Sequence, residues 1–310
     1  MSDHEMQYAK LGGVLIPVGA TQPRLTAGFY ELGSANHQYG FAPSKPVSDD
    51  LIDIAGTPAD DVNEDIKKFL ATKGRYQKAG LTHKRGYLFY GPPGTGKTSL
   101  GLMIARRFIK DADGVVIHIP NSAHLSILTD ALRKVEPGRP SMFLMEEADN
   151  FVNDVTALSI LDGEQSLAGA VFVAMTNYKS KMPPRIANRP GRFDRVVYIG
   201  APPYAVQVEY FKRLLARLEE DPATATVIAD GIKDVDCSMG HLREAFISHV
   251  LMGVKMEEIR KRFIEMADGL GKDESPTGES EDAPYGTCES CGCDLDSDGT
   301  CSDEDCDCDD

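Results

Sequence analysis

One eight-residue stretch has the residue types and spacing of a phosphate-binding loop. Residues 91–98 read Gly-Pro-Pro-Gly-Thr-Gly-Lys-Thr and fit the pattern G-x-x-x-x-G-K-[ST]. In this pattern glycines let backbone N–H groups turn toward phosphate oxygens, the lysine reaches the terminal phosphates, and the last hydroxyl holds Mg²⁺. The alternative is a glycine- and proline-rich turn that matches by chance. The predicted nucleotide contacts are Pro93, Gly94, Thr95, Gly96, Lys97, Thr98 and Ser99.

The flanks of this loop contain the elements that such a loop requires. Residues 86–90 form a short apolar run typical of a strand, and residues 99–109 have the spacing of an amphipathic helix. A helix that begins at the loop adds the positive end of its dipole to the phosphate site. Because both flanks are correct, we favour a phosphate loop over a chance match.

A pair of carboxylates follows another apolar stretch. Residues 142–145 read Met-Phe-Leu-Met and precede Glu146 and Glu147. Ligands of open α/β sheets bind at the carboxyl ends of the strands. At that position Glu146 would hold Mg²⁺ through water, and Glu147 would orient and polarise the attacking water of a phosphoryl transfer. The alternative is a strand followed by an acidic helix cap.

Two further segments place polar side chains at the same edge. Asn177 follows a predicted strand at 170–175 and could hydrogen-bond the attacking water or the γ-phosphate, with an asparagine in a turn as the alternative. Arg189 and Arg192 flank a Pro-Gly turn before a predicted strand at 196–199. An arginine from a neighbouring subunit stabilises transition-state charge in phosphoryl transfer. The alternative for this pair is a solvated basic loop.

These motifs, in this order, resemble those of the AAA family of P-loop ATPases. The similarity covers residues 51–267 and includes GPPGTGKT, FLMEEAD, MTN and RPGRFDR. The resemblance implies ATP and Mg²⁺ as cofactors, Asn177 as the residue called sensor 1, and Arg189 and Arg192 as arginine fingers that reach a neighbour's nucleotide. It also implies a homo-oligomer, usually a hexameric ring. The implied adenine-pocket residues are Ile54, Gly56 and Gly240.

Within this family the run at residues 84–91 is similar to the mitochondrial inner-membrane AAA chaperones, whose membrane helix we do not find in this sequence. Three positions differ from the family pattern or have an open role. Glu146 replaces the usual aspartate, which adds one methylene. Residues 120–125 lack the aromatic pore loop of family unfoldases. The aromatic residue that usually serves polypeptide threading is therefore missing. Arg243 could act as a lid sensor or as a solvated helix arginine.

The order of the predicted elements defines the fold class. Five apolar strands alternate with helices, which predicts an α/β fold with a parallel five-stranded P-loop (AAA+) ATPase sheet flanked by helices. From residue 204 the pattern becomes helical and predicts a small lid. The predicted domains are an N-terminal extension (1–50), a nucleotide-binding domain (51–202), a helical lid (203–270), an acidic linker (271–287) and a cysteine-rich acidic tail (288–310).

Acidic charge is concentrated at the C-terminal end. The net charge is −15, and residues 271–310 contain 15 acidic residues and one basic residue. Such a tail repels phosphate backbones and argues against nucleic acid as its partner, although a basic patch on the body is not excluded. No apolar run has the length of a membrane helix, and the first residues do not resemble a signal peptide. We therefore expect no membrane partner and a cytoplasmic location.

Six of the seven cysteines lie between residues 288 and 308. The spacing C-x₂-C, nine residues, C-x₄-C is close to that of zinc sites, and metal would have to supply the folding energy of this segment. The preferred zinc ligands are Cys288, Cys291, Cys301 and Cys306. The alternative is a disordered acidic tail with reducible thiols. Cys237 lies apart from this group and is expected to be structural.

Three functions compete at this point. The leading one is an ATP-hydrolysing machine that remodels an unidentified protein or protein–nucleic-acid partner. The second is a nucleotide-dependent assembly switch or scaffold with slow hydrolysis, which the missing aromatic pore loop favours. The third is a DNA-metabolism factor of the loader kind, which the zinc-like tail favours and the acidic charge disfavours.

Overall fold

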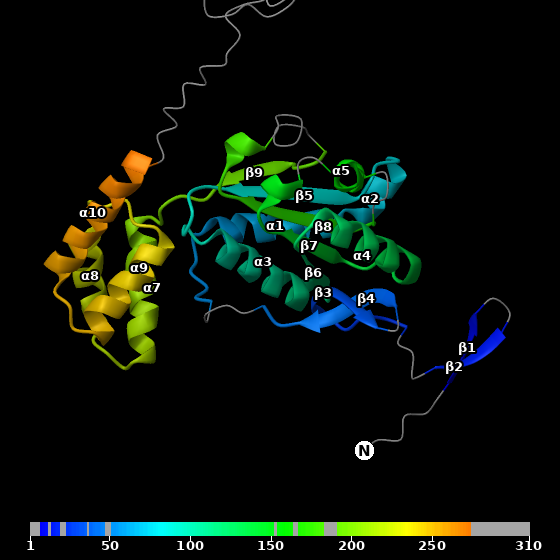
Figure 1. Ribbon diagram of the computed structural model, residues 1–310, viewed down its shortest axis with the longest axis horizontal. Coiled ribbons are helices and arrows are strands. Elements are labelled where there is room, and N and C mark those ends of the chain that lie inside the picture. Colours follow the sequence, from blue (N-terminus) through cyan, green and yellow to red (C-terminus); the bar gives the residue numbers. More distant parts are fainter. Residues whose placement is uncertain are drawn as a thin grey trace, which may run out of the picture. The chain divides into compact units, whose positions relative to one another are not determined.

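The computed structural model describes residues 7–11, 14–18, 23–35, 37–46, 51–151, 154–163, 167–182 and 191–273. Its largest sheet has the strand order β4-β3-β6-β7-β8-β5-β9 (Figure 1). These strands are β3 (Gly28–Ala35), β4 (Gln38–Ser44), β5 (Lys84–Tyr90), β6 (Val115–Ile119), β7 (Ser141–Met145), β8 (Ala170–Thr176) and β9 (Arg195–Tyr198). A hairpin of β1 (Gln7–Leu11) and β2 (Val14–Val18) precedes them. The chain divides into two compact units, residues 1–260 and 261–310.

The predicted α/β fold is confirmed, but the sheet is wider than expected. The five predicted strands form the consecutive parallel run β6-β7-β8-β5-β9. Two more strands extend it, because β3 pairs in parallel with β6 over residues 28–30 and β4 pairs antiparallel with β3. Both come from the predicted N-terminal extension, where glycine and proline interrupt the apolar alternation that signals a strand. The expectation of five strands was therefore too small.

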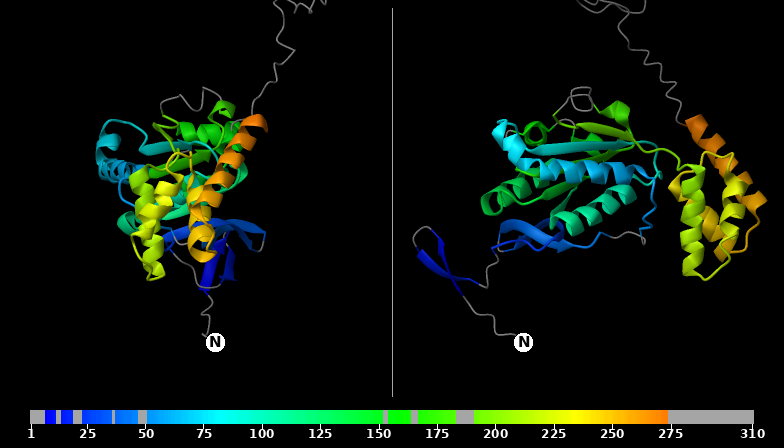
Figure 2. Two further views of the ribbon diagram at one scale, coloured as in Figure 1. Left: turned by 90° about the vertical axis from the view of Figure 1, so that its left-hand side faces the viewer. Right: turned by 180° about the vertical axis from the view of Figure 1, so that it is seen from behind.

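Helices cover both faces of this sheet, so each face has its own core. The covering helices are α1 (Pro58–Ala71), α3 (Lys97–Ala112), α4 (Ser122–Val135) and α5 (Val155–Asp162), and a short α2 (Lys73–Lys78) follows α1. Tyr87 and Phe89 on β5 belong to the core under α1 and α3, which lie side by side (Figure 2), whereas Leu88 belongs to the core under α4 and α5. With both faces covered, the strand ends are where polar side chains can gather.

The predicted helical segment after β9 is also present. It contains α7 (Tyr204–Arg217), α8 (Thr224–Ile232), α9 (Met239–Phe246), a π-helical turn η3 (Ile247–Leu251) and α10 (Met256–Asp273). A capping box begins α9, in which the Ser238 hydroxyl accepts from the backbone N–H of His241 and the His241 imidazole accepts from the backbone N–H of Ser238. The cap fixes where α9 starts, next to Gly240.

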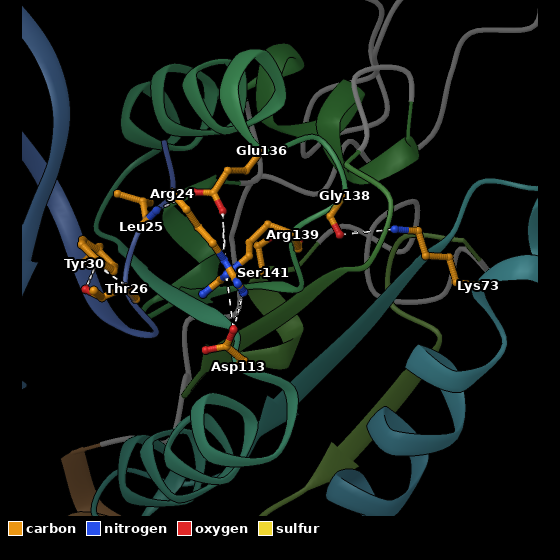
Figure 3. Close-up of polar contacts among 10 residues, drawn as sticks. All are labelled: Arg24, Leu25, Thr26, Tyr30, Lys73, Asp113, Glu136, Gly138, Arg139 and Ser141. Carbon is orange, nitrogen blue, oxygen red and sulfur yellow. Dashed lines mark hydrogen bonds and ion pairs between the residues drawn. The ribbon is translucent and has the colours of Figure 1, made fainter. Parts of the chain in front are cut away.

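A charged cluster holds the segment that leads into β3 (Figure 3). The Glu136 carboxylate accepts a 2.7 Å hydrogen bond from the backbone N–H of Leu25. Arg24 pairs with Asp113 and lies 3.8 Å from Glu136, and the buried Arg139 guanidinium lies 3.5 Å from Asp113 and 3.8 Å from Glu136. These carboxylates offset only part of the cost of burying Arg139, because its guanidinium nitrogens make no hydrogen bond to the described residues. The cluster therefore fixes the N-terminal strands to the α/β domain.

A buried histidine gives the domain a pH-dependent stability. The His83 ring is 3% exposed, stacks on Phe69 with 4.0 Å between ring centroids, and makes a 2.9 Å hydrogen bond from Nε2 to the Phe69 carbonyl oxygen. Burial lowers the pKa of His83 below its ordinary value of 6.5. Below that pH the unfolded chain binds a proton that the folded chain does not, so stability falls as the pH falls.

We therefore expect the free energy of unfolding to decrease below pH 6.5 by up to about 1.4 kcal/mol per pH unit from His83 alone. Urea unfolding of the parent and of His83→Gln between pH 7.5 and 5 measures this contribution. The variant should be less stable at pH 7.5 and should show the shallower loss. Parallel stability curves for the two proteins would show that His83 does not titrate as inferred.

Candidate nucleotide-binding site

The phosphate loop has the backbone that its sequence predicts. It connects β5 to α3, and Gly94 and Gly96 have φ angles of 75° and 92°, which glycine adopts without strain. The Lys97 ammonium lies inside the loop and donates to the carbonyl oxygens of Gly91, at 2.8 Å, and Pro92, at 2.7 Å. Burial lowers the pKa of Lys97. A cation held in a glycine cradle at a helix N-terminus fits a bound polyphosphate, whose charge would favour the protonated lysine.

The other predicted loop contacts divide into buried and exposed residues. Thr95 is buried, and its hydroxyl donates to the Pro92 carbonyl oxygen at 2.9 Å, which closes the loop on itself. The remaining predicted contacts are exposed or half-buried, as a surface that receives a ligand requires: Pro93, Gly94, Gly96, Thr98 and Ser99.

The two predicted Mg²⁺ ligands are brought together by α3 and β7. The Thr98 side chain lies near the Glu146 carboxylate, and the His118 Nε2 lies 3.6 Å from Glu146 Oε2. Hydrogen bonding to His118 is the largest cause that lowers the pKa of Glu146, with a further contribution from Thr98. An ionised carboxylate beside a hydroxyl oxygen is the hard donor set that Mg²⁺ prefers. The donor set therefore fits the predicted metal.

Glu147 follows in an unusual backbone conformation. Its φ angle is 48°, a left-handed value that costs energy in a residue with a side chain and is common at functional sites. Its carboxylate accepts a 3.2 Å hydrogen bond from the Asn150 side chain. The turn at Glu147 separates its side chain from that of Glu146, so two adjacent glutamates can have different roles.

The ends of β7 and β8 are joined by side chains that the sequence motifs did not identify. The Thr176 hydroxyl donates to Asp149 at 2.7 Å and accepts from the backbone N–H of Tyr178 at 3.0 Å. Asn177 lies between these residues and is exposed. The network thus fixes the backbone on both sides of Asn177. A sequence signal did exist, because Asp149 ends the acidic motif and Thr176 precedes the asparagine.

The three predicted adenine-pocket residues come from two regions. Ile54 is 4% exposed, and Gly56 has a φ angle of 80° and donates its N–H to Asp60 at 2.8 Å. Gly240 at the start of α9 donates its N–H to the Gly94 carbonyl oxygen at 3.1 Å. The last contact joins the lid to the phosphate loop directly. Arg243, for which the sequence left open a lid sensor or a solvated arginine, is exposed on the same helix.

The two predicted arginine fingers stay predictions. Arg189 lies outside the described residues. Arg192 is buried and makes two 2.7 Å hydrogen bonds to Asp162 at the end of α5, so it is bound within its own chain rather than projecting toward a neighbour. The sequence could not show this because Asp162 and Arg192 meet only through the fold. The Lys84 ammonium donates to the carbonyl oxygens of Leu161 and Gly191 and anchors the same loop.

Gly86 allows this loop to approach β5. It exchanges 2.8 Å hydrogen bonds with Asp194, and a Cβ at residue 86 would lie 2.0 Å from the Arg192 carbonyl oxygen. We expect Gly86→Ala to lower the free energy of unfolding by about 3 kcal/mol, because the loop backbone must move. Gly40→Ala in β4 is the control, since no atom lies within 4 Å of its added carbon. Equal stability of both variants in urea unfolding would contradict this packing.

The predicted zinc ligands Cys288, Cys291, Cys301 and Cys306 lie outside the described residues, so the zinc site stays a prediction. Among the described residues no group of three or more potential metal-binding side chains is found. Cys237 is buried, and burial together with the nearby Asp236 raises the pKa of its thiol to about 11. A thiol that stays protonated in a core has the structural character that was expected of it.

A mostly parallel sheet with a phosphate loop after β5 and a carboxylate pair after β7 is the arrangement of a P-loop fold. Residues 87–201 match the family described as ATPase family associated with various cellular activities (AAA). Residues 87–201 therefore form an AAA ATPase domain, and the predicted family resemblance is confirmed for this part of the chain.

Several curated proteins are similar to this chain. It is 31% identical over 180 residues to the ATP-dependent zinc metalloprotease FtsH 2 of Thermoanaerobacter sp. (strain X514), which covers 52% of this chain and 35% of that protein. It is 30% identical over 208 residues to the probable mitochondrial chaperone bcs1 of Schizosaccharomyces pombe, with 60% and 43% covered. It is 27% identical over 172 residues to the proteasome-activating nucleotidase of Methanococcus vannielii, with 49% and 42% covered.

The chain thus spans less than half the length of these three relatives. Within the described part of the chain, no helix has both the length and the apolar content needed to cross a bilayer.

Proposed function

We propose that this protein binds ATP with Mg²⁺ at the carboxyl ends of β5, β7 and β8 and hydrolyses it in a ring, usually a hexamer in this family, that remodels a protein or protein–nucleic-acid partner. The observation that carries the proposal is the buried Lys97 ammonium in the glycine loop, one residue before the Thr98 hydroxyl that contacts Glu146. The cation for phosphates and the hydroxyl for a metal are then adjacent at the start of α3, and Glu146 after β7 supplies the second oxygen. The family match over residues 87–201 supports the same conclusion.

Each residue has a role that its position supports. Lys97 would bind the terminal phosphates, and its burial strengthens that attraction. Thr98 and Glu146 would hold Mg²⁺, which when bound neutralises charge on the phosphate oxygens. Glu147 would orient the attacking water and take its proton, and Asn177 would hydrogen-bond that water or the γ-phosphate. Ile54, Gly56 and Gly240 would surround the base.

A neighbouring copy of the chain would complete the site. We assign the finger to Arg189, because Arg192 could reach a neighbour only after leaving its two hydrogen bonds to Asp162. An arginine supplied in trans is worth about 10³–10⁵ in rate in well-studied phosphoryl transfers. Hydrolysis should therefore depend on assembly.

The test is the rate of ATP hydrolysis per subunit, measured with the full chain over a range of protein concentrations in Mg²⁺ and again in EDTA. We expect the rate per subunit to rise with concentration, to reach a plateau when assembly is complete, and to vanish in EDTA. A rate per subunit that does not change while the protein goes from monomer to oligomer would overturn the arginine assignment. Absence of Mg²⁺-dependent hydrolysis at every concentration would overturn the proposed activity.

A specific observation favours the second candidate function, a nucleotide-dependent switch or scaffold. Only Pro120 and Asn121 connect β6 to α4, and the Asn121 side chain caps that helix by accepting from the His124 backbone N–H at 3.1 Å. This connection leaves no projecting loop where family unfoldases carry their aromatic pore residue. Hydrolysis that a candidate protein partner stimulates several-fold would favour the remodelling machine, whereas hydrolysis that stays slow with every partner would favour the switch.

We also propose zinc in the cysteine-rich tail, a suggestion that the spacing of Cys288, Cys291, Cys301 and Cys306 supports. In a cytoplasmic protein, which is the location the sequence predicts, thiols stay reduced and available to a metal. The full chain should then contain about one zinc per subunit by elemental analysis, and Cys291→Ser should lose it. A zinc-free protein prepared without chelator would refute the proposal.

A further inference from the structure

Arg107 joins the phosphate-binding helix to the segment that precedes α1. It lies in α3, and its Nη1 donates to Asp60 Oδ1 at 2.8 Å. On its other side the guanidinium binds Asp53 through two hydrogen bonds, one of them from Nε to Oδ2 at 3.3 Å. One side chain thus holds both ends of the segment 53–60.

The second oxygen of Asp60 continues this chain of contacts to the backbone of the segment. Asp60 Oδ2 accepts the N–H of Gly56 at 2.8 Å, and Gly56 has a left-handed φ angle of 80°. Hydrogen bonding to Arg107 is the largest cause that lowers the pKa of Asp60, so the carboxylate stays charged and holds both partners at neutral pH. Ile54, between the two carboxylates, is 4% exposed. The segment therefore has a defined course although it precedes any regular helix.

This network positions the segment 53–60 and contributes little to the free energy of folding. The side chains of Arg107, Asp60 and Asp53 are 28%, 38% and 57% exposed, and exposed ion pairs contribute little to folding. The same contacts, however, fix the segment to a rigid helix whose first residue is Lys97. Ten residues of α-helix span about 15 Å, so α3 sets the separation between the phosphate loop and the segment.

We propose that Arg107 is a positioning residue for the nucleotide base: through Asp53 and Asp60 it places the segment around Ile54 and Gly56 against the base while Lys97 holds the phosphates. The inference rests on the proposed function, which puts the base beside that segment. Arg107 itself does not touch the nucleotide in this account. Its loss should weaken the recognition of the base and leave the recognition of phosphate unchanged.

The experiment compares two ligands on the full chain. Isothermal titration in Mg²⁺ gives the Kd of ATP, which has a base, and of inorganic tripolyphosphate, which has none. Arg107→Gln should raise the Kd of ATP about tenfold and leave that of tripolyphosphate within about twofold. Arg107→Lys keeps the charge but lacks the forked guanidinium that binds both carboxylates. It should therefore bind ATP more tightly than Arg107→Gln but less tightly than the parent. Arg106→Gln is the matched control, since Arg106 is the exposed neighbour in α3.

Two results would overturn the inference. An equal loss of affinity for both ligands in Arg107→Gln would mean that the residue only supports the fold, and unchanged ATP affinity would mean that it does not position the segment. Asp60→Asn provides a second variant, which should show the same selective loss because Asp60 is the residue that links Arg107 to the Gly56 backbone. A parent chain that binds neither ligand would instead overturn the proposed function and this inference together.

Discussion

Glu147→Gln should lower the turnover of ATP by about 10³-fold and leave ATP binding intact. The glutamine keeps the size of the side chain and the partner at Asn150, so the left-handed turn at residue 147 can persist. It cannot take a proton from the attacking water. The loss should therefore appear in kcat and not in the Kd of ATP, and a variant that binds without hydrolysing should accumulate as an assembled, nucleotide-bound complex. Steady-state hydrolysis and equilibrium ATP binding measure the two quantities separately.

Glu219→Gln is the matched control for this change. Glu219 is another exposed glutamate with a left-handed backbone, at a φ angle of 58°, in the turn after α7. Its replacement by glutamine also removes one negative charge from a residue with a left-handed backbone. This residue, however, lies far along the chain from the site. We expect parental turnover. If Glu147→Gln hydrolysed ATP as fast as this control, Glu147 could not be the residue that activates water.

Lys97→Ala should weaken the binding of ATP by at least about 100-fold, which corresponds to the loss of charged hydrogen bonds to phosphate. In the structure the ammonium donates to the loop carbonyl oxygens of Gly91, at 2.8 Å, and Pro92, at 2.7 Å, and burial already lowers its pKa. A bound phosphate group would thus pair with a cation that is already desolvated. Unlike Glu147→Gln, this variant should lose affinity as well as turnover.

Lys110→Ala serves as its control because Lys110 is exposed in the last turn of the same helix. Titration of ATP in Mg²⁺ should give the parental Kd for this control. Thermal unfolding without nucleotide should be similar for the two alanine variants and the parent. Parental affinity in Lys97→Ala would refute the placement of phosphate in the loop.

Much of the local structure around the candidate site was predictable because its signals are local. The glycines around Lys97 and the pair Glu146–Glu147 occur in short runs whose flanking strands and helix have clear periodicity. The apolar run predicted to be a strand at 142–145 is β7, Ser141–Met145. Continuous apolar runs of this kind are typical of parallel strands buried on both faces.

What the sequence did not show depends on pairs of residues far apart in the chain. Strand β3 joins the sheet through three parallel register pairs with β6, and no local sequence pattern predicts that pairing. The bonds from Arg192 to Asp162 and from Arg107 to Asp53 and Asp60 link positions 30 to 54 residues apart. From sequence alone, a charged residue on a helix is predicted to face solvent, because a partner far along the chain cannot be identified. The same applies to His118, whose polarity within β6 is visible but whose partner Glu146 is not.

The most direct test of the central claim is the titration of ATP into the full chain with Mg²⁺ and with EDTA, at concentrations where the protein self-associates. The account predicts saturable binding of about one nucleotide per subunit, weakened by EDTA and lost in Lys97→Ala. A parent protein that binds no adenine nucleotide in Mg²⁺, or that binds it equally well when Lys97 is absent, would contradict the account.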